Sequence, residues 1–329
     1  MEVFSHVFLQ MLVLGTAVVI GVIARKLHFM NDEVDTKLSQ IIMTFTIPAL
    51  ILDSVLSNTN LPSFDSLVLA LGLSAIASAL ICLLAVIVVR VFFRGTPKYA
   101  RGAYEYIISF GNTGQIGFAV LAVILGDNGV LYGAICNISY TIFCYSFGTL
   151  FVLNTVQQED DGHEKTEEEL KLARKHRIKE IIKQLISPCL ISSIVAMFLA
   201  LFGITDTEGY CGQTCELVGG IAIPASMIVI GSTLAKMNIK EVLSDFWSYV
   251  ASVLRLLGAP LLVYFLGSFF VTDHMVLAVL VIQAGMPAAV AGIMMSLAYG
   301  GDSVTMTRGT FITTVLSLFT LPFICMLVV

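Results

Sequence analysis

The sequence predicts an all-α polytopic membrane protein with ten transmembrane helices, arranged as two inverted repeats of five helices. Three observations predict this fold. Apolar runs of about 20 residues follow one another along the chain, which is the length that a helix needs to cross a bilayer. Only 12% of the residues are charged and 57% are hydrophobic, whereas soluble domains have about 25% charged residues. Two of the apolar runs are also interrupted at corresponding places in the two halves.

Ten apolar segments are expected to cross the membrane. They cover residues 4–24, 38–57, 66–89, 102–125, 129–154, 187–203, 215–235, 246–270, 275–298 and 303–328. One long charged connector, residues 156–186, separates the first five-helix repeat (1–155) from the second (187–329). Ser187 and Pro188 are typical of an N-cap and a first helical turn, so the sixth span is expected to begin there. No basic patch lies outside the loops, and no nucleic-acid partner is expected.

Lysine and arginine residues predict the orientation in the bilayer. Sixteen of the 18 basic residues lie in or beside the odd-numbered loops, and the even-numbered loops have none. Because cytoplasmic loops are enriched in these residues, both termini are expected outside a plasma membrane, which in a bacterium is the inner membrane. This orientation also places Cys211 and Cys215 outside, where a disulfide and two free thiols are both open alternatives.

The two remaining basic residues lie inside predicted spans. Arg308 is close to the cytoplasmic end of the tenth span, where it either reaches the interface or faces the interior as a partner for a carboxylate. Arg255 lies deeper in the eighth span, and an ionisable residue at that depth indicates either a functional role or structural pairing.

An internal repeat is indicated by markers that recur at a nearly constant offset. Three pairs lie 175 or 176 residues apart: Ile47–Ala49 with Ile223–Ala225, Gly111 with Pro287, and Gly126–Asp127 with Gly301–Asp302. A repeat with an odd number of spans is inserted upside down relative to its partner, so these markers favour an inverted repeat.

The interruptions of the fourth and ninth spans predict the binding site. Residues 109–117 read Ser-Phe-Gly-Asn-Thr-Gly-Gln-Ile-Gly, and residues 283–289 contain a Gly-Met-Pro sequence. Non-helical backbone at membrane depth is tolerated only where it is buried in protein or lines a cavity. In an inverted repeat the two breaks would meet, and the helix N-termini beyond them would favour an anion or a carboxylate. The polar side chains could alternatively serve only to satisfy the freed backbone. The predicted substrate-binding residues are Gly111, Asn112, Thr113, Gly114, Gln115, Pro287, Ala288 and Arg308.

The segment Gly111–Gly114, followed by an apolar half-helix, resembles the Gly-Asn-Thr-Gly segment of the auxin efflux carrier family. This family includes plant PIN-type auxin carriers and bacterial carriers assigned to malonate or malate. Residues 286–299 and the pattern that follows resemble the last two spans of the family. The residues of that pattern are Thr310, Thr314, Leu318, Leu321 and Pro322.

The resemblance implies crossed broken helices four and nine, in a fold similar to that of bile-acid symporters and cation antiporters. It also implies a scaffold of helices 1, 2, 6 and 7, a transport domain of helices 3–5 and 8–10, elevator-type alternating access and a homodimer. Plant members carry Asn-Pro-Asn-Thr-Tyr at the break, and this sequence departs from that pattern at Gly111 and Gly114. The third span also has no charged residue, and a carboxylate smaller than auxin is therefore expected.

The expected function is secondary transport of a small carboxylate or dicarboxylate, coupled to protons, to sodium or to neither. Export of an auxin-like indole carboxylate is one alternative. A sodium–proton antiporter is another, but it would need a carboxylate beside the crossing, and no Asp or Glu lies between Glu105 and Asp127 or between Asp273 and Asp302. No span carries a paired acid and base or a metal-ligand spacing, so neither an enzyme nor a cofactor or metal is expected.

Overall fold

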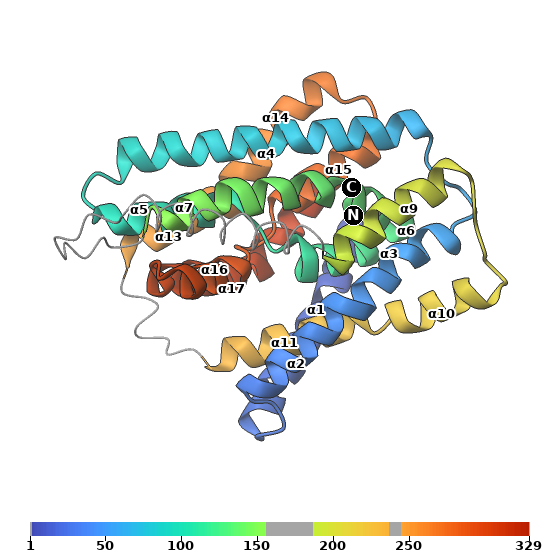
Figure 1. Cartoon of the computed structure of the whole chain (residues 1–329), viewed down its shortest axis with the longest axis horizontal. Helices are drawn as coiled ribbons and strands as arrows, with labels where there is room; N and C mark the ends of the chain where they lie inside the picture. The colour runs from blue at the N-terminus through green and yellow to red at the C-terminus, as the bar shows by residue number, and fades with distance from the viewer. Residues whose placement is uncertain (1, 156–186, 237–244, 329) are drawn as a thin grey trace, which may run out of the picture.

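The computed structural model describes residues 2–155, 187–236 and 245–328, and the regular structure in these ranges is helical (Figure 1). The predicted connector 156–186 lies outside the described residues. The helices are α1 (Glu2–Lys26), α2 (Asp32–Ile41), α3 (Ile47–Leu56), α4 (Phe64–Phe92), α5 (Lys98–Ser109), α6 (Phe118–Phe143), α7 (Thr149–Leu153), α9 (Pro188–Leu201), α10 (Tyr210–Gly219), α11 (Ala222–Lys236), α13 (Phe246–Val253), α14 (Ala259–Phe270), α15 (His274–Ala284), α16 (Ala291–Tyr299) and α17 (Ser303–Val328). Four π-helical turns are η1 (Ile42–Thr46), η2 (Thr113–Gly117), η3 (Cys144–Gly148) and η4 (Leu254–Gly258).

Among the residues that the structure describes, six helical stretches are long and apolar enough to cross a membrane, as in a multi-pass, all-helical membrane protein. These stretches are Asp32–Leu56, Phe64–Phe92, Thr113–Leu153, Tyr210–Lys236, Phe246–Phe270 and Ser303–Val328. Two shorter apolar helices are α9 and α15. Ser187 caps α9 as predicted, because its hydroxyl accepts a hydrogen bond from the Leu190 N–H at 3.2 Å.

The stretch Thr113–Leu153 folds back on itself at Gly126, where the φ of 65° interrupts α6. A side chain on Gly133 would run into Leu121. These two residues would lie about 18 Å apart along a straight helix, so the two parts of α6 must pack against each other. The turn falls where the sequence predicts the join between the fourth and fifth spans.

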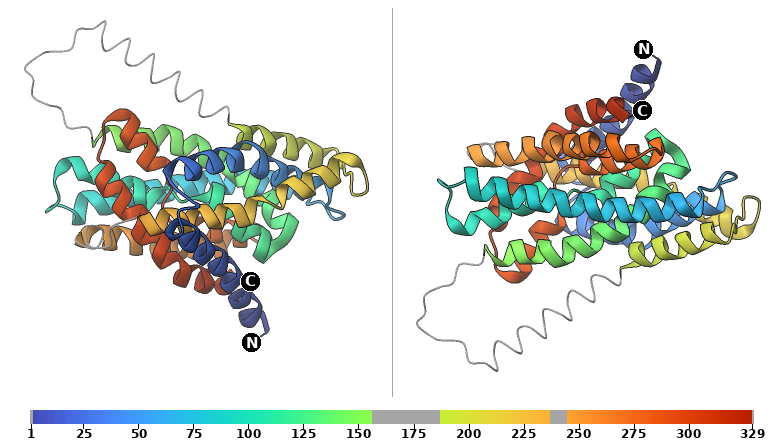
Figure 2. Two further views of the ribbon diagram at one scale, coloured as in Figure 1. Left: turned by 90° about the horizontal axis from the view of Figure 1, so that it is seen from below. Right: turned by 90° about the horizontal axis from the view of Figure 1, so that it is seen from above.

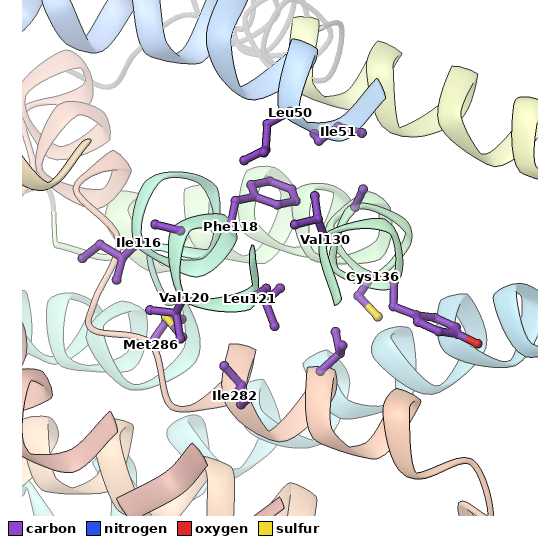
Figure 3. Packing of buried hydrophobic residues seen from close by; sticks show 14 of the residues in the cluster. Leu50, Ile51, Ile116, Phe118, Val120, Leu121, Val130, Cys136, Ile282 and Met286 are labelled. Carbon is purple, nitrogen blue, oxygen red and sulfur yellow. The ribbon is translucent and has the colours of Figure 1, made fainter. Parts of the chain in front are cut away.

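The largest apolar core surrounds α6, which lies between α3 and α15. In Figure 3, Phe118 points toward Leu50 and Ile51 of α3, and Leu121 points toward Ile282 of α15. Phe118 is 1% exposed, so this face of α6 is fully covered by protein. The beginning of α6, which follows the break at Gly111, is therefore packed against α3 on one side and α15 on the other.

Large apolar side chains are exposed along the outer face of α14. They include Leu261, Phe265, Phe269 and Phe270, the last of which is 80% exposed. A contiguous apolar face of this kind suits contact with lipid hydrocarbon rather than with water. Figure 2 shows that the beginning of α1 and the end of α17 lie near each other on one side of the molecule.

Helices α1 and α11 approach each other closely. A side chain on Gly21 would fall on the backbone carbonyl of Ile228, and one on Gly231 would fall on that of Val18. Small residues at such contacts let two helix backbones approach within van der Waals distance in a membrane.

Gly21→Val is expected to lower the thermal unfolding midpoint of the purified protein. Overpacking at a backbone contact typically costs about 1–3 kcal/mol. Gly15→Val, on the same helix, is the matched control, because a Cβ at Gly15 meets nothing within 4 Å. Equal midpoints for the two variants would show that α1 and α11 do not pack in this way.

One expected boundary is wrong, and the open alternative for two cysteines is decided. The seventh span begins at Tyr210 rather than at residue 215, because the Asp206 carboxylate accepts a hydrogen bond from the Gly212 N–H at 3.1 Å in the first turn of α10. Cys211 and Cys215 lie on α10, and both are free thiols rather than a disulfide.

Candidate functional site

The two interruptions meet in the interior, as the sequence predicts. Gly111 and Ala288 form an isolated antiparallel β-bridge. The Asn112 N–H donates to the Pro287 carbonyl at 2.6 Å, and the Ala289 N–H donates to the Phe110 carbonyl at 3.0 Å. Each unwound segment thus supplies hydrogen-bond partners for the other, which meets the requirement that backbone groups away from water be paired.

Four helix ends converge on this crossing. Helices α5 and α15 bring their C-termini, which end at Ser109 and Ala284. The helical segment η2–α6 begins at Thr113, and α16 begins at Ala291, so these two bring their N-termini. C-termini carry partial negative charge and N-termini partial positive charge, and the crossing therefore has one pair of ends of each sign.

The polar side chains of the first break partly satisfy the backbone, which is the alternative that the sequence leaves open. The Asn112 side-chain oxygen accepts from the Gln115 N–H at 3.2 Å and so caps η2. The Thr113 hydroxyl donates to the side-chain oxygen of Asn137 at 3.0 Å. No hydrogen bond within the described ranges uses the Asn112 amide nitrogen or the Gln115 side chain. These two groups remain available to a ligand.

Arg255 places a charged group at the crossing. It is 2% exposed and is one of the largest fully buried side chains of the described residues. Its guanidinium donates to four backbone carbonyls, all at the C-terminal ends of α5 and α15 or just beyond them. The bonds are Nε to Met286 at 2.8 Å, Nη1 to Ser109 at 3.0 Å and to Ile108 at 3.3 Å, and Nη2 to Gln283 at 3.3 Å. No carboxylate pairs with Arg255 in the described residues.

The π-helical turn η4 positions Arg255, and a nearby proline explains the turn. Pro260 lies in the first turn of α14, directly after η4. A proline within a continuous helix lacks an N–H and clashes with the carbonyl four residues earlier, and a widened turn accommodates both effects. At the other end of this helical stretch, the Asp245 carboxylate accepts from the Trp247 N–H at 3.1 Å and from the Tyr104 hydroxyl at 2.6 Å. The helix that carries Arg255 is thereby tied to α5.

A glycine is required where Arg255 meets the first break. A Cβ at Gly111 would overlap Nη2 of Arg255 and would lie 3.1 Å from the Cβ of Met286. On the other side, the Gly111 carbonyl accepts a hydrogen bond from the Tyr140 hydroxyl at 2.5 Å. The backbone of Gly111 is thus enclosed by a guanidinium and a phenol.

A cavity of about 40 Å³ lies beside the guanidinium. Its polar lining includes Ser74, Ser109, Thr113, Tyr140, Arg255 and Gln283. The Ser109 hydroxyl is buried and has no hydrogen-bond partner among the described residues. By the volume that a buried water needs, the cavity holds roughly three water molecules.

A second cavity, also about 40 Å³, separates α1 and α11 from η2, α6 and α17. Its lining is mainly aliphatic and includes Val18, Ile116 and Met227, with Thr314 and Ser317 as the polar members. Ile116 belongs to η2, so this cavity adjoins the N-terminal end of the second half-helix.

Seven of the eight predicted site residues belong to the two segments that meet. Gly114 and Gln115 are half-buried, and a Cβ at Gly114 would lie 3.4 Å from the Met43 side chain. Arg308 is half-buried on α17, lines neither cavity and has no hydrogen bond or ion pair to another described residue. Its place in the site therefore stays a prediction.

Four residues that the sequence did not assign to the site also contact the crossing: Arg255, Tyr140, Asn137 and Thr313. The depth of Arg255 in an apolar segment indicated either a functional role or structural pairing, but nothing local indicated which backbone atoms it meets. Glu105 of α5, the acidic residue that precedes the first break, is buried and 5% exposed.

A family model described as "Membrane transport protein" matches residues 6–325. The chain belongs to this family. It is the auxin efflux carrier family that the Gly-Asn-Thr-Gly segment resembles, and the match includes both breaks. This membrane transport protein is 24% identical over 306 residues to an uncharacterized transporter of Methanothermobacter thermautotrophicus, and the match covers 93% of each chain. It is also 22% identical over 220 residues to an uncharacterized transporter of Methanocaldococcus jannaschii, covering 66% of this chain and 65% of that one.

Thr313 of this membrane transport protein ties α17 to the second break. Its hydroxyl accepts from the Ala288 N–H at 3.0 Å and donates to the Gly309 carbonyl at 2.7 Å. Thr313→Val leaves the buried Ala288 N–H without a partner, and such a group costs about 1–3 kcal/mol. We expect the thermal unfolding midpoint of the purified protein to fall accordingly.

Thr320→Val is the matched control for this prediction. Thr320 lies on the same helix, and its buried hydroxyl has no hydrogen-bond partner among the described residues. The control is expected to be neutral or slightly stabilising. A Thr313→Val variant as stable as the control would contradict the bond to Ala288.

Proposed function

We propose that this membrane transport protein is a secondary transporter for a small organic anion, a carboxylate or dicarboxylate such as malonate or malate. The observation that carries this proposal is the charge balance at the crossing. The Arg255 guanidinium contacts carbonyls at the two helix C-termini, each of which carries about half a negative charge, so one positive charge offsets both.

The two helix N-termini are then left without a countercharge. The stretches 106–126 and 274–301, which form the crossing and its flanks, contain no Asp or Glu. Two ends of about half a positive charge each amount to roughly one unit, which an anion would neutralise. The free amide nitrogen of Asn112 and the side chain of Gln115 would orient a carboxylate there, with Thr113, Gly114, Pro287 and Ala288 around it.

We extend the proposal to elevator-type alternating access on the resemblance to the auxin efflux carriers. In the proposed division, α1, α2–α3, α9 and α10–α11 form the scaffold, in which α1 packs against α11 and α3 against α9 and α10, and both α3 and α9 also pack against α6 of the proposed transport domain. The transport domain would consist of α4–α7 and α13–α17. The cavity lined by Val18 and Ile116 lies between the two groups, where a substrate would pass the scaffold.

The proposal also includes the repeat organisation, the orientation in the membrane and the oligomeric state. We take the chain as two inverted five-helix repeats, 1–155 and 187–329, joined by the connector 156–186 and related through the crossed helices four and nine. We place it in the plasma membrane with both termini outside, following the basic residues of the odd-numbered loops. A homodimer is proposed on the resemblance to the auxin efflux carriers.

Uptake into proteoliposomes tests the function directly. Malonate, malate, lactate and indole-3-acetate would be supplied with and without imposed proton and sodium gradients. Saturable uptake of a small carboxylate is the expected result. Uptake of indole-3-acetate alone would replace the small carboxylate by an auxin-like substrate. Cation-dependent proton flux without uptake of any carboxylate would refute the proposal in favour of an antiporter.

A further inference from the structure

We propose that Arg255 is a resident cation, held permanently where transporters with broken helices bind a coupling cation, so that this crossing operates without sodium. The inference rests on the proposed function and deepens it, because it specifies that transport is not coupled to sodium. Its transport measurements therefore require the proposed anion transport. Its stability measurements need no substrate.

The contacts of Arg255 are those of a bound cation. Unwound carbonyls and the C-terminal ends of half-helices are the groups that coordinate sodium in transporters with interrupted spans. At this crossing the carbonyls of Ile108 and Ser109 come from α5, and those of Gln283 and Met286 come from the end of α15. One guanidinium uses all four of these carbonyls, because its planar fork presents donors in several directions at once.

The position leaves no electrostatic role for a second cation. Two helix C-termini together carry about one negative charge, which the guanidinium already matches. Arginine keeps its charge at physiological pH and is covalently attached to η4, so this charge neither binds nor dissociates during transport. A sodium ion at the same carbonyls would have to displace the guanidinium.

The surrounding residues make room for the guanidinium and not for a free ion. Gly111 lacks the Cβ that would overlap Nη2, so the side chain lies directly against the backbone of the break. The adjoining cavity of about 40 Å³ is lined by the hydroxyl-bearing residues Ser109 and Tyr140, and it opens onto the guanidinium. Truncation of Arg255 would extend this cavity to the four carbonyls, where a small cation could then enter.

The test compares Arg255→Ala and Arg255→Lys with Arg94→Ala, which removes an exposed arginine from the loop between α4 and α5. Thermal unfolding midpoints are measured on purified protein in choline chloride, and again after addition of sodium or methylguanidinium. Arg255→Ala is expected to have a lower midpoint that methylguanidinium or sodium restores in part, whereas the wild type and Arg94→Ala respond to neither. Arg255→Lys is expected to be intermediate, because one ammonium cannot bridge both helix ends.

Uptake by the wild type supplies the second measurement. It is expected to be equal, within twofold, in sodium and in choline, and Arg255→Ala is expected to lose it more than tenfold. Sodium-dependent uptake by the wild type, or a wild-type midpoint that sodium raises, would overturn the inference even if Arg255→Ala cannot be purified. An Arg255→Ala midpoint equal to that of Arg94→Ala would overturn it as well. If the wild type transports none of the anions but Arg255→Ala is stabilised by methylguanidinium, the proposed substrate fails and the resident cation stands.

Discussion

Gly111→Ala is expected to abolish uptake and to destabilise the protein, although it adds a single methyl group. The new Cβ would overlap Nη2 of Arg255 and would lie 3.1 Å from the Cβ of Met286. Overpacking in a core typically costs about 1–3 kcal/mol, and each carbonyl bond that the guanidinium loses adds about 1.5–3 kcal/mol. The methyl group therefore disturbs both breaks at once.

The measurement is uptake together with the thermal unfolding midpoint, and Gly72→Ala serves as the control. Gly72 lies within α4, and a Cβ there meets nothing within 4 Å. Alanine in a helix interior is more favourable than glycine by about 0.5–1 kcal/mol, so the control is expected to be as stable as the wild type or more stable. Wild-type uptake by Gly111→Ala would mean that Arg255 does not lie against this backbone.

Asn112→Ala is expected to reduce uptake more than tenfold at a small cost in stability. Its side-chain oxygen caps η2 through the Gln115 N–H, and loss of an N-cap costs about 1 kcal/mol. Asn31→Ala is the matched control, since Asn31 caps α2 in the same way, by accepting from the Val34 N–H at 2.9 Å. The control is expected to show a comparable loss of stability and to retain uptake, because α2 begins outside the crossing.

Asn112→Asp separates the structural role of this side chain from its role in binding. Asp and Asn are equally good N-caps, so the variant is expected to keep the stability of the wild type. Its carboxylate would neutralise the helix N-terminus that the transported anion is proposed to use, and uptake is expected to be lost. Full uptake by Asn112→Asp in well-folded protein would show that the transported group does not lie beside residue 112.

The polar character of the first break has two causes that only the structure separates. The Asn112 oxygen accepts from the Gln115 N–H of the break, and the Thr113 hydroxyl is bonded to the Asn137 side chain, so neither group is free for a ligand. The amide nitrogen of Asn112 is left over. A sequence shows that a segment is rich in donors and acceptors, but the number that remain for a ligand depends on partners supplied by other helices.

Local properties of the chain were sufficient to predict the helical class and most of the helix boundaries. Hydropathy over about 20 residues and the low helix propensity of glycine and proline act within one segment, so they are visible without a fold. The places of the two breaks, the turn at Gly126 and the Ser187 cap were predicted on this basis. The start of α10 was missed, because its cap depends on Asp206, six residues before the group that it binds.

The sequence by itself determined a helical membrane protein, the two interruptions and the residues that form them, because each follows from the chemistry of a short segment. The tertiary structure alone decided the surroundings of those interruptions. Arg255 meets Ser109 across 146 residues of chain, and Thr313 meets Ala288 across 25. Such contacts depend on how helices pack, since a buried charge is stable only where it is paired or hydrogen-bonded, and the carbonyls that bond Arg255 come from two other helices. The sign of the charge left at the crossing, and hence the proposed preference for an anion, follows from that convergence.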